Sequence, residues 1–289
     1  MIETRKSKIA FLLPALTWIF AVSIFPLIFT VGLSLFHWNL GYSLPTFNGI
    51  ANYLEILSDS RFWNSVKISV IFTVVTLTLE FTLALALATL LNTEIKGVNI
   101  LKPLCTIPLF ASPIAIAFIS VVIFNEQYGP INAFMNFLGF GPVRWISSAW
   151  GGMISIMLVD IWQWTPFIFL MLLAGMQSLP ADPLEAAKID GASKLQSFRF
   201  VTLPMLRPVM TFAFLFKLIE SFKAFDVAFV LTGGGPGVST ELYSLHVYRV
   251  ALKYFQIGKG CSLSVLLLLA VTLIAIKFLK QFGSIWEGS

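Results

Sequence analysis

Apolar and polar positions alternate along this chain in blocks that match the thickness of a lipid bilayer. A membrane-spanning helix needs about 20 predominantly apolar residues, and runs of that length recur between shorter polar segments. The pattern predicts an all-α polytopic membrane protein in which a single transmembrane domain occupies residues 1–289. The six spans that we predict lie at about 9–36, 66–91, 103–124, 149–174, 209–231 and 260–280.

The first apolar run begins like a secretory signal peptide. Arg5, Lys6 and Lys8 precede it, and Ala21-Val22-Ser23 is similar to a cleavage site. The run continues to Phe36, whereas the apolar region of a signal peptide has about 7–15 residues. We therefore expect a retained span.

The composition supports lipid as the solvent for most of the chain. Hydrophobic residues make up 57% of the sequence and charged residues 11%, whereas soluble domains are about 45–50% apolar and about one quarter charged. A single soluble core of this size cannot bury so much apolar surface, which excludes a soluble enzyme. The two cysteines and two histidines form no CxxC pair or Cys/His cluster, so we expect neither a disulfide framework nor a metal site.

Lysine and arginine residues indicate the orientation in the membrane. If the N-terminus is cytoplasmic, eleven of them fall in cytoplasmic segments and six in external segments or their margins. Cytoplasmic segments carry the excess of these residues. We therefore predict that both termini are cytoplasmic, which six spans allow.

The connection between the fourth and fifth spans, at about 175–208, is long and lies on the predicted cytoplasmic side. Asp182 suits an N-cap, Pro183 the first helical position and Glu185 the acidic position of a capping box. Gly191 suits the left-handed residue that follows a helix. These signals predict a short helix between Pro183 and Gly191.

A second short helix is predicted to follow in the same connection. Ser193 and Gln196 form another capping box, and we expect the helix to end before Pro204, because proline interrupts helical hydrogen bonding. Local chemistry leaves two interpretations open. The first helix, 183–190, can enter a groove on another protein, or both helices can lie along the membrane interface.

The connection also carries a long sequence motif. Glu185-Ala186-Ala187, Asp190-Gly191-Ala192, Leu203-Pro204 and Pro208 stand at the spacing of the EAA motif. The chain therefore resembles the permeases of ABC importers.

Segments on the predicted external side narrow this resemblance. Gly129-Pro130-Ile131-Asn132, the LTGGGP stretch at 231–236 and Ser239-Thr240-Glu241 are similar to the carbohydrate-uptake branch, of the maltose and glycerol-phosphate permease type. The resemblance covers nearly the whole chain. The length of 289 residues and the LTGGGPG-x-STE loop resemble the first of two paired permeases.

The resemblance implies a type I ABC-importer permease fold and a division of labour. Helix 183–190 would be the coupling helix, which docks in a cleft of a separate ATPase. The residues that the resemblance assigns to ATPase coupling are Glu185, Ala186, Ala187, Asp190, Gly191, Leu203 and Pro204.

The resemblance also implies the partners and the location of the chain. They are a second permease in a heterodimer, a dimer of cytoplasmic ATPase subunits, an external solute-binding protein that touches about 129–135 and 232–248, and a sugar substrate. The membrane would be the inner membrane of a prokaryotic cell, and no nucleic acid is involved. ATP and Mg²⁺ would bind to the ATPase, and this chain would bind no cofactor and would not be an enzyme. The sequence agrees, because it contains no G-x-x-x-x-G-K-[ST] phosphate-binding motif.

The fifth predicted span contains charges, which are costly in a membrane. Four of them follow one another at i+3 spacing: Lys217, Glu220, Lys223 and Asp226. Each isolated charge costs about 2.5–3.5 kcal/mol at the bilayer centre on insertion scales, so they must pair or face protein or water. One helical face, which we expect to line the translocation path, carries Lys217, Glu220, Ser221 and Ala224. The alternative is a structural ladder of ion pairs.

The fourth predicted span offers a matching face. Its members are Asp160, Gln163, Trp164 and Phe167. Pro166 can kink this helix. Aromatic rings stack on the apolar faces of sugars, and amides, hydroxyls and acids bind sugar hydroxyls. A candidate sugar site therefore combines Gln163, Trp164 and Phe167 with Glu220 and Ser221, with packing as the alternative role of the aromatic residues.

Glu80 is the single acidic residue of the second predicted span. It can be protonated, or it can pair with a lysine of another span. A competing function, an ion-coupled secondary transporter or a channel, would use Glu80 and the charges of the fifth span. An intramembrane enzyme is not supported, because the sequence has no GxSxG or HExxH motif.

Overall fold

The computed structural model of the chain describes residues 5–41, 44–93 and 97–282, most of which are helical. The chain divides into two compact units. The first unit comprises residues 1–62 and 246–272, and the second unit comprises residues 63–245 and 273–289.

The first unit begins with the first predicted span. The segment Phe11–Leu33 has 23 residues, is apolar enough to cross a membrane and has no buried side chains. It consists of α1 (Arg5–Ile19), the π-helical turn η1 (Phe20–Ile24) and α2 (Phe25–Leu33). An apolar helix without buried side chains exposes its whole surface to lipid or to another subunit.

Polar contacts hold the end of this span in the first unit. The amide of Asn52, on α3 (Ala51–Ser58), donates hydrogen bonds to the carbonyl oxygens of Ser34 and Phe36 at 3.0 and 2.9 Å. Ser262, on α15 (Ile257–Phe282), donates to the same Ser34 carbonyl at 2.9 Å. These bonds satisfy carbonyls that the end of a helix leaves free.

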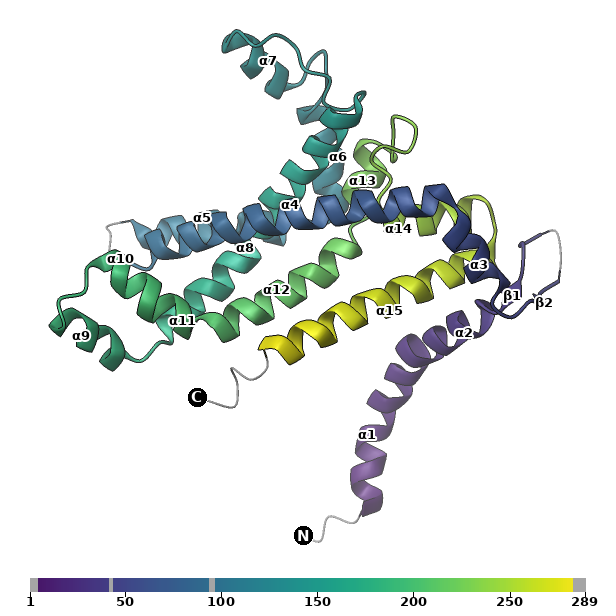
Figure 1. Ribbon diagram of the computed structural model, residues 1–289, viewed down its shortest axis with the longest axis horizontal. Helices are drawn as coiled ribbons and strands as arrows, with labels where there is room; N and C mark the ends of the chain where they lie inside the picture. The colour runs from purple at the N-terminus through teal and green to yellow at the C-terminus, as the bar shows by residue number, and fades with distance from the viewer. Residues whose placement is uncertain (1–4, 42–43, 94–96, 283–289) are drawn as a thin grey trace. The chain divides into compact units, whose positions relative to one another are not determined.

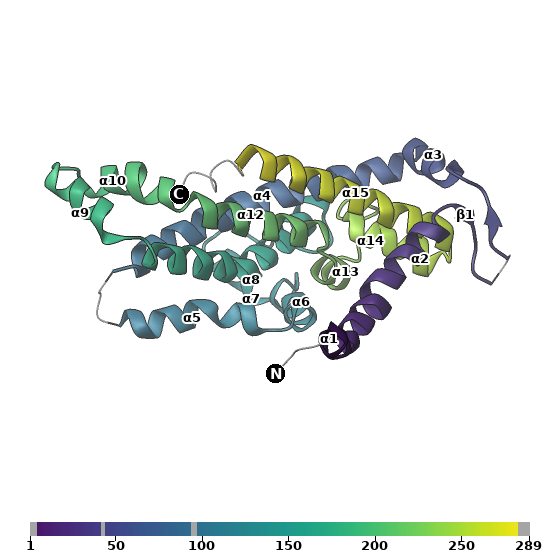
Figure 2. The same cartoon turned by 90° about the horizontal axis from the view of Figure 1, so that it is seen from below.

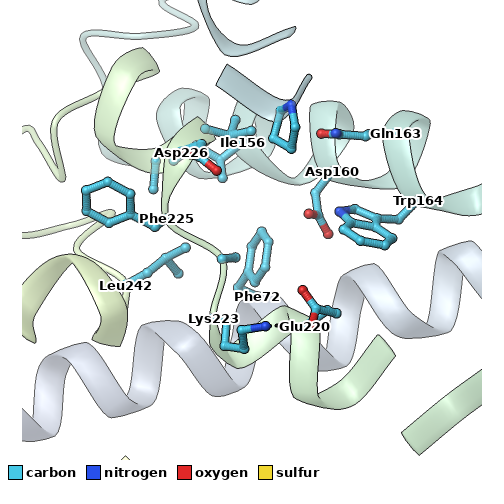
Figure 3. Close-up of a pocket in the computed structure, with 14 residues that line it drawn as sticks. Phe72, Ile156, Asp160, Gln163, Trp164, Glu220, Lys223, Phe225, Asp226 and Leu242 are labelled. Atoms are coloured by element: carbon cyan, nitrogen blue, oxygen red, sulfur yellow. Dashed lines mark hydrogen bonds and ion pairs between the residues drawn. The ribbon is translucent and has the colours of Figure 1, made fainter. Parts of the chain in front are cut away.

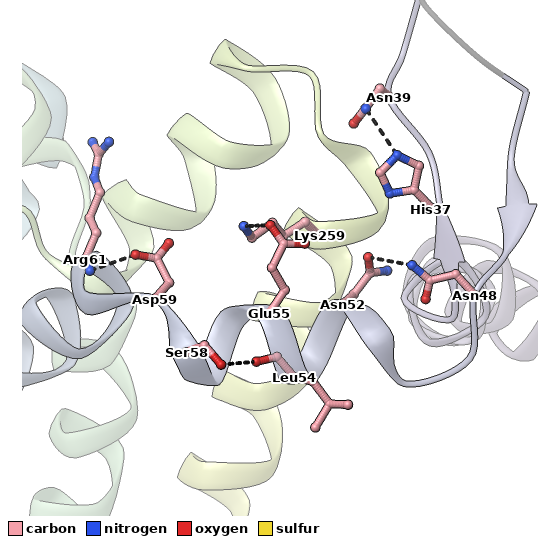
Figure 4. Close-up of polar contacts among 10 residues, drawn as sticks. All are labelled: His37, Asn39, Asn48, Asn52, Leu54, Glu55, Ser58, Asp59, Arg61 and Lys259. Carbon is pink, nitrogen blue, oxygen red and sulfur yellow. Dashed lines mark hydrogen bonds and ion pairs between the residues drawn. The ribbon is translucent and has the colours of Figure 1, made fainter.

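Two further features complete the first unit. A short hairpin pairs β1 (Phe36–His37) with β2 (Thr46–Phe47) in antiparallel fashion. The ammonium group of Lys259 donates to the carboxylate of Glu55 at 2.7 Å, which joins α15 to α3 (Figure 4).

The second unit is a helical assembly built around α8. Helix α8 packs against α5, α6, α12 and α13 (Figures 1 and 2). Of the helices that can span a membrane, α8 is the most buried, because its Ile168, Phe169 and Leu172 enter an apolar core with Ala84 and Ala88 of α4. The helices of this unit are α4 (Ser60–Leu91), α5 (Val98–Phe110), α6 (Pro113–Ile123), α7 (Pro130–Phe137), α8 (Ala149–Gln177), α9 (Ala181–Ile189), α10 (Lys194–Ser197), α11 (Leu203–Met205), α12 (Arg207–Phe222), α13 (Asp226–Leu231) and α14 (Tyr243–Tyr248).

Two predicted spans differ from straight helices. The third is a pair, α5 and α6, that is bent by 95°. Ser112 is extended and Pro113 begins α6, and proline both removes a hydrogen bond and clashes with the preceding turn. Four helices among the described residues are long and apolar enough to span a membrane, or five if the bent pair counts as one span.

The fifth predicted span is broken. Helix α12 ends at Phe222, and α13 begins only at Asp226. Lys223 is the C-cap of α12 and Asp226 opens α13. A basic residue at a helix C-terminus and an acidic residue at an N-terminus are both stabilised by the helix dipoles, so the charges that strain a continuous apolar span fit well at a break.

The segment between α6 and α8 is organised by two polar side chains. The amide of Asn132, on α7, donates to the carbonyl oxygens of Glu126 and Val143 and accepts a 2.8 Å hydrogen bond from the indole of Trp145. The carboxylate of Glu126 accepts hydrogen bonds from the Ile146 amide, at 3.1 Å, and from the amide and hydroxyl of Ser147. The bond from the Ser147 backbone amide is the main reason that the pKa of Glu126 lies below its ordinary value of 4.5.

We expect the amides of Ile146 and Ser147 to lose protection from hydrogen exchange in acid. Because the folded pKa of Glu126 is lowered, its contribution to stability is present above its ordinary pKa of 4.5 and is lost as the pH falls through the folded value. Protection factors across this range measure the effect. Glu126→Gln should show weaker protection that does not change with pH, and equal pH dependence in the two proteins would contradict the assignment.

Candidate functional site

The long connection between α8 and α12 forms the tip of a helical hairpin (Figures 1 and 2). Helices α9 and α10 lie there, followed by the π-helical turn η2 (Phe198–Thr202) and α11. Helix α9 has no buried residues, and Glu185, Ala186 and Asp190 are all exposed. The side chain of Ile189 is 86% exposed. An exposed helix with an uncovered apolar residue is suited to contact with another protein.

Gly191 ends α9 as the sequence predicts. It has a φ of +79°, a conformation that residues with a Cβ atom rarely adopt. Its amide donates to the carbonyl of Lys188 at 3.1 Å, and the amide of Ala192 donates to the carbonyl of Ala187 at 2.9 Å. These two bonds form a Schellman motif, which fixes the direction in which the chain leaves the helix.

Other details of this connection differ from the predictions. Helix α9 begins at Ala181 with Pro180 as its N-cap, so Asp182 lies in the first turn and does not cap the helix. The second helix does have the predicted capping box of Ser193 and Gln196.

The chain nevertheless continues through Pro204 in helical form. The π-helical turn η2 leads directly into α11, where Leu203 and Pro204 are half-buried. Proline near the start of a helix is tolerated, because the amide that it lacks would be free there.

The two arms of the hairpin pack closely next to the connection. A Cβ atom added to Gly175, on α8, would lie 3.0 Å from Leu206 and 3.1 Å from Val209. Leu206 is completely buried. A larger residue here would press on the side chains of Leu206 and Val209, so glycine permits the close packing of α8 against the start of α12.

A buried ion cluster joins the same arms further along. The ammonium group of Lys217, on α12, donates to Asp160 of α8 at 2.8 Å and lies 3.2 Å from the carboxylate of Glu80 on α4. The side chains of Lys217 and Glu80 are 1% and 0% exposed. Glu80 thus lies next to a lysine of another predicted span, which agrees with the pairing that was one of its two possible roles. Lys217 also lies over the ring of Trp164, at 4.9 Å from its centroid.

A cavity of about 120 Å³ lies beside this cluster, between α8 and the break that follows α12 (Figure 3). In Figure 3, Asp160 and Trp164 face Glu220 and Lys223 across it. Glu220 and Lys223 form a 2.7 Å ion pair. The lining consists of Phe72, Pro113, Ile156, Asp160, Gln163, Trp164, Glu220, Lys223, Ala224, Phe225, Asp226, Val227, Ala228 and Leu242.

Part of the predicted substrate path coincides with this cavity. Gln163, Trp164, Glu220 and Ala224 line it. The alternative interpretation of the fifth span was a ladder of ion pairs among its four charges. Within this span, the described structure contains only the Glu220–Lys223 pair of that ladder.

The remaining predicted residues of the path lie behind the cavity wall. Lys217 belongs to the ion cluster. The hydroxyl of Ser221 is buried without a hydrogen-bond partner among the described residues. Phe167 stacks on Phe216, with 4.7 Å between ring centroids, and meets Trp164 edge-on.

The lining also contains residues that were not assigned to the path from the sequence, among them Asp226 and Pro113. The break between α12 and α13 brings Asp226 into the cavity, and the bend before α6 brings Pro113 there. The Ser112-Pro113 pair is the signal that the sequence offered for the bend.

Comparison with known proteins gives consistent matches. Residues 80–282 match the family described as binding-protein-dependent transport system inner membrane component. The trehalose/maltose transport system permease protein MalF of Thermococcus litoralis is 36% identical over 96% of this chain and 95% of its own length. The sulfoquinovosyl glycerol transport system permease protein SmoG of Agrobacterium fabrum is 31% identical over 96% of this chain and 91% of its own length.

A solved structure has a similar fold. It is a bacterial ABC transporter involved in the import of the acidic polysaccharide alginate. The TM-score is 0.83 at 19% identity, and the match covers 95% of this chain and 94% of that chain.

We expect Lys217→Met to destabilise the protein much more than Glu80→Gln. Removing the ammonium leaves two buried carboxylates unpaired, which costs about 3–5 kcal/mol for a buried pair. Glu80→Gln leaves the Asp160–Lys217 pair intact. Thermal unfolding of the detergent-solubilised protein measures both effects, and equal losses in the two variants would contradict this account of the cluster.

Proposed function

The chain belongs to the family of binding-protein-dependent transport system inner membrane components, and we propose that it is a permease subunit of an ATP-driven importer of a sugar or sugar derivative. The observation that carries this proposal is the hairpin formed by α8 and α12. Its tip is an exposed helix, and its other end forms the wall of a polar and aromatic cavity. The names of the two relatives, which refer to trehalose/maltose and sulfoquinovosyl glycerol, support the carbohydrate class.

The hairpin provides a mechanism of coupling. A separate ATPase dimer contacts α9 through Glu185, Ala186 and Ala187, and its closure moves this helix. The arms are joined at Gly175 and again at the Asp160–Lys217 pair. These points lie about 22 Å apart along α8 at the rise of an α-helix. Movement of the tip therefore displaces both walls of the cavity together, as in an inward-open to outward-open transition.

The remaining coupling residues act by shaping the tip. Asp190 and Gly191 set the turn after α9, and Leu203 and Pro204 hold the return segment. Docking the tip into a cleft thus requires the correct turn as well as the exposed side chains.

The cavity supplies the substrate path in this proposal. Its volume of about 120 Å³ is below the roughly 300–1,000 Å³ of typical ligand sites. A second permease therefore contributes the rest of the site, and an external binding protein delivers the sugar. ATP and Mg²⁺ bind to the ATPase subunits, and this chain binds no cofactor.

We expect Gly191→Val to reduce sugar uptake by the assembled importer and Gly191→Asn to retain most of it. Asparagine tolerates positive φ, whereas a β-branched residue there carries strain of about 1–2 kcal/mol, which is about a five- to thirtyfold shift in an equilibrium. Uptake and sugar-stimulated ATP hydrolysis should fall together for valine. Membrane insertion of both variants, measured by immunoblot, is the control, and normal coupling in Gly191→Val would contradict a role of α9 in docking.

Reconstitution separates the importer from an ion-coupled carrier. Proteoliposomes that hold this chain alone should show no sugar uptake under a proton or sodium gradient. Adding the second permease, the ATPase and the binding protein should produce uptake that depends on ATP. Gradient-driven uptake by the chain alone would support the secondary transporter instead.

A further inference from the structure

The charges around the cavity define the class of sugar that it accepts. Provided that the chain imports a sugar, as proposed above, we propose that its cavity admits uncharged, hydroxyl-rich sugars and rejects sugars that carry a carboxylate, sulfonate or phosphate group. The fold does not dictate this choice, because a similar fold belongs to an importer of an acidic polysaccharide.

Among the described residues, both lysines at or next to the cavity have an acidic partner. Lys217 is 1% exposed and does not line the cavity. Both Asp160 and Glu80 lie within 3.2 Å of its ammonium group. Recruiting Lys217 to a substrate would leave two buried carboxylates without a countercharge.

The second lysine is also engaged. Lys223 lines the cavity, and its ammonium group donates to Glu220 at 2.7 Å. An anionic sugar that approaches Lys223 also approaches the Glu220 carboxylate, which already neutralises this ammonium group and repels a second anion.

The lining as a whole is negative. It contains three carboxylates, on Asp160, Glu220 and Asp226, against the one ammonium of Lys223, which leaves two formal negative charges. Lys217, behind the wall, donates to Asp160 at 2.8 Å and so offsets one of these charges, which leaves the lining with a net negative charge. Asp226 has no ion-pair or hydrogen-bond partner for its side chain among the described residues, so no cation neutralises its charge, although the N-terminus of α13 stabilises it. Like charges in a site of low dielectric constant repel strongly.

One feature of the cavity, the N-terminus of α6, favours an anion instead of repelling it. Helix α6 begins at the cavity, and the N-terminus of a helix favours negative charge. Its first residue is Pro113, which has no amide hydrogen to offer. The proline therefore removes one of the free amides at this helix end.

The uncharged groups of the cavity suit a neutral sugar. Gln163 is only 4% exposed, and its amide has no hydrogen-bond partner among the described residues. Gln163 lines the cavity, and both the donor and the acceptor of its amide match sugar hydroxyls. Trp164 supplies an aromatic surface beside it, and the carboxylates can accept hydrogen bonds from further hydroxyls.

Thiol labelling tests the charge of the cavity directly in the whole importer. Ala224→Cys places a thiol in the lining, with Cys105 and Cys261 replaced by alanine. Two methanethiosulfonate reagents of similar size, one with a trimethylammonium group and one with a sulfonate group, then compete for it. Each rate is divided by the rate at Ala133→Cys, an alanine on the exposed surface of α7, measured before the binding protein is added because that protein is expected to touch residues 129–135. Ala228→Cys, also in the lining, serves if the first variant does not assemble.

We expect the normalised rates to favour the cationic reagent by about tenfold or more, because the lining carries net negative charge. Adding Asp226→Asn should reduce this preference. Equal rates, or a preference for the anionic reagent, would overturn the proposed selection.

A second readout uses sugars as protecting ligands. At equal concentration and ionic strength, trehalose should slow the labelling of Ala224→Cys, whereas glucuronate should not, and protection by glucuronate would also overturn the selection. If neither reagent reaches the thiol with or without ATP while Ala133→Cys is labelled, the cavity is not on the path. That result would count against the proposed function and is distinct from a reversed charge preference.

Discussion

One ammonium group, that of Lys217, meets carboxylates from two other helices in a region that water does not reach. Taking charges out of water costs several kcal/mol for each ion, so the cluster persists only where its three side chains meet closely. Rotation or sliding of α4, α8 or α12 against the others would separate these charges. The cluster therefore fixes the register of the three helices, and the positions of Trp164 and Asp160 in the cavity wall depend on it.

The fixed geometry of the ion cluster also explains how it acts together with the close helix contact at Gly175, which lies further along α8. The close approach at Gly175 holds the arms of the hairpin at one end, and the cluster holds them at the other. An apolar contact alone would permit sliding, because dispersion contacts are not directional. A charged pair in a fixed geometry does not permit it. The buried ion pair between α8 and α12 thus fixes how these helices are aligned. Apolar packing between them would fix this alignment less firmly.

The sequence predicted those features whose causes are local. Gly191 and the Ser193–Gln196 capping box were found because helix ends are determined by a few neighbouring residues. Long apolar runs likewise located four of the six predicted spans among the described residues, whereas the third is a bent pair and the fifth is broken. The partner of Glu80 was expected to be a lysine, but only the tertiary structure shows that it is Lys217.

The predictions failed where one helical face was extended across an interruption. Periodicity placed Lys217 and Glu220 on the same lining face, yet only Glu220 reaches the cavity, because tertiary ion pairs hold Lys217 inside the protein. The i+3 spacing also stops being meaningful after Phe222, where α12 ends. Asp226 consequently lies in the cavity wall rather than on a ladder along one helix.

Pro166 makes α8 easier to bend at one place along its length. It lies between the two points at which α8 is fastened to α12, and proline removes the amide that would bond to the carbonyl of Trp162. A helix bends most readily where its hydrogen-bond ladder is interrupted. Bending of α8 will therefore concentrate within one turn of Gln163 and Trp164. The helix is thus most flexible at the place where the cavity wall must change shape.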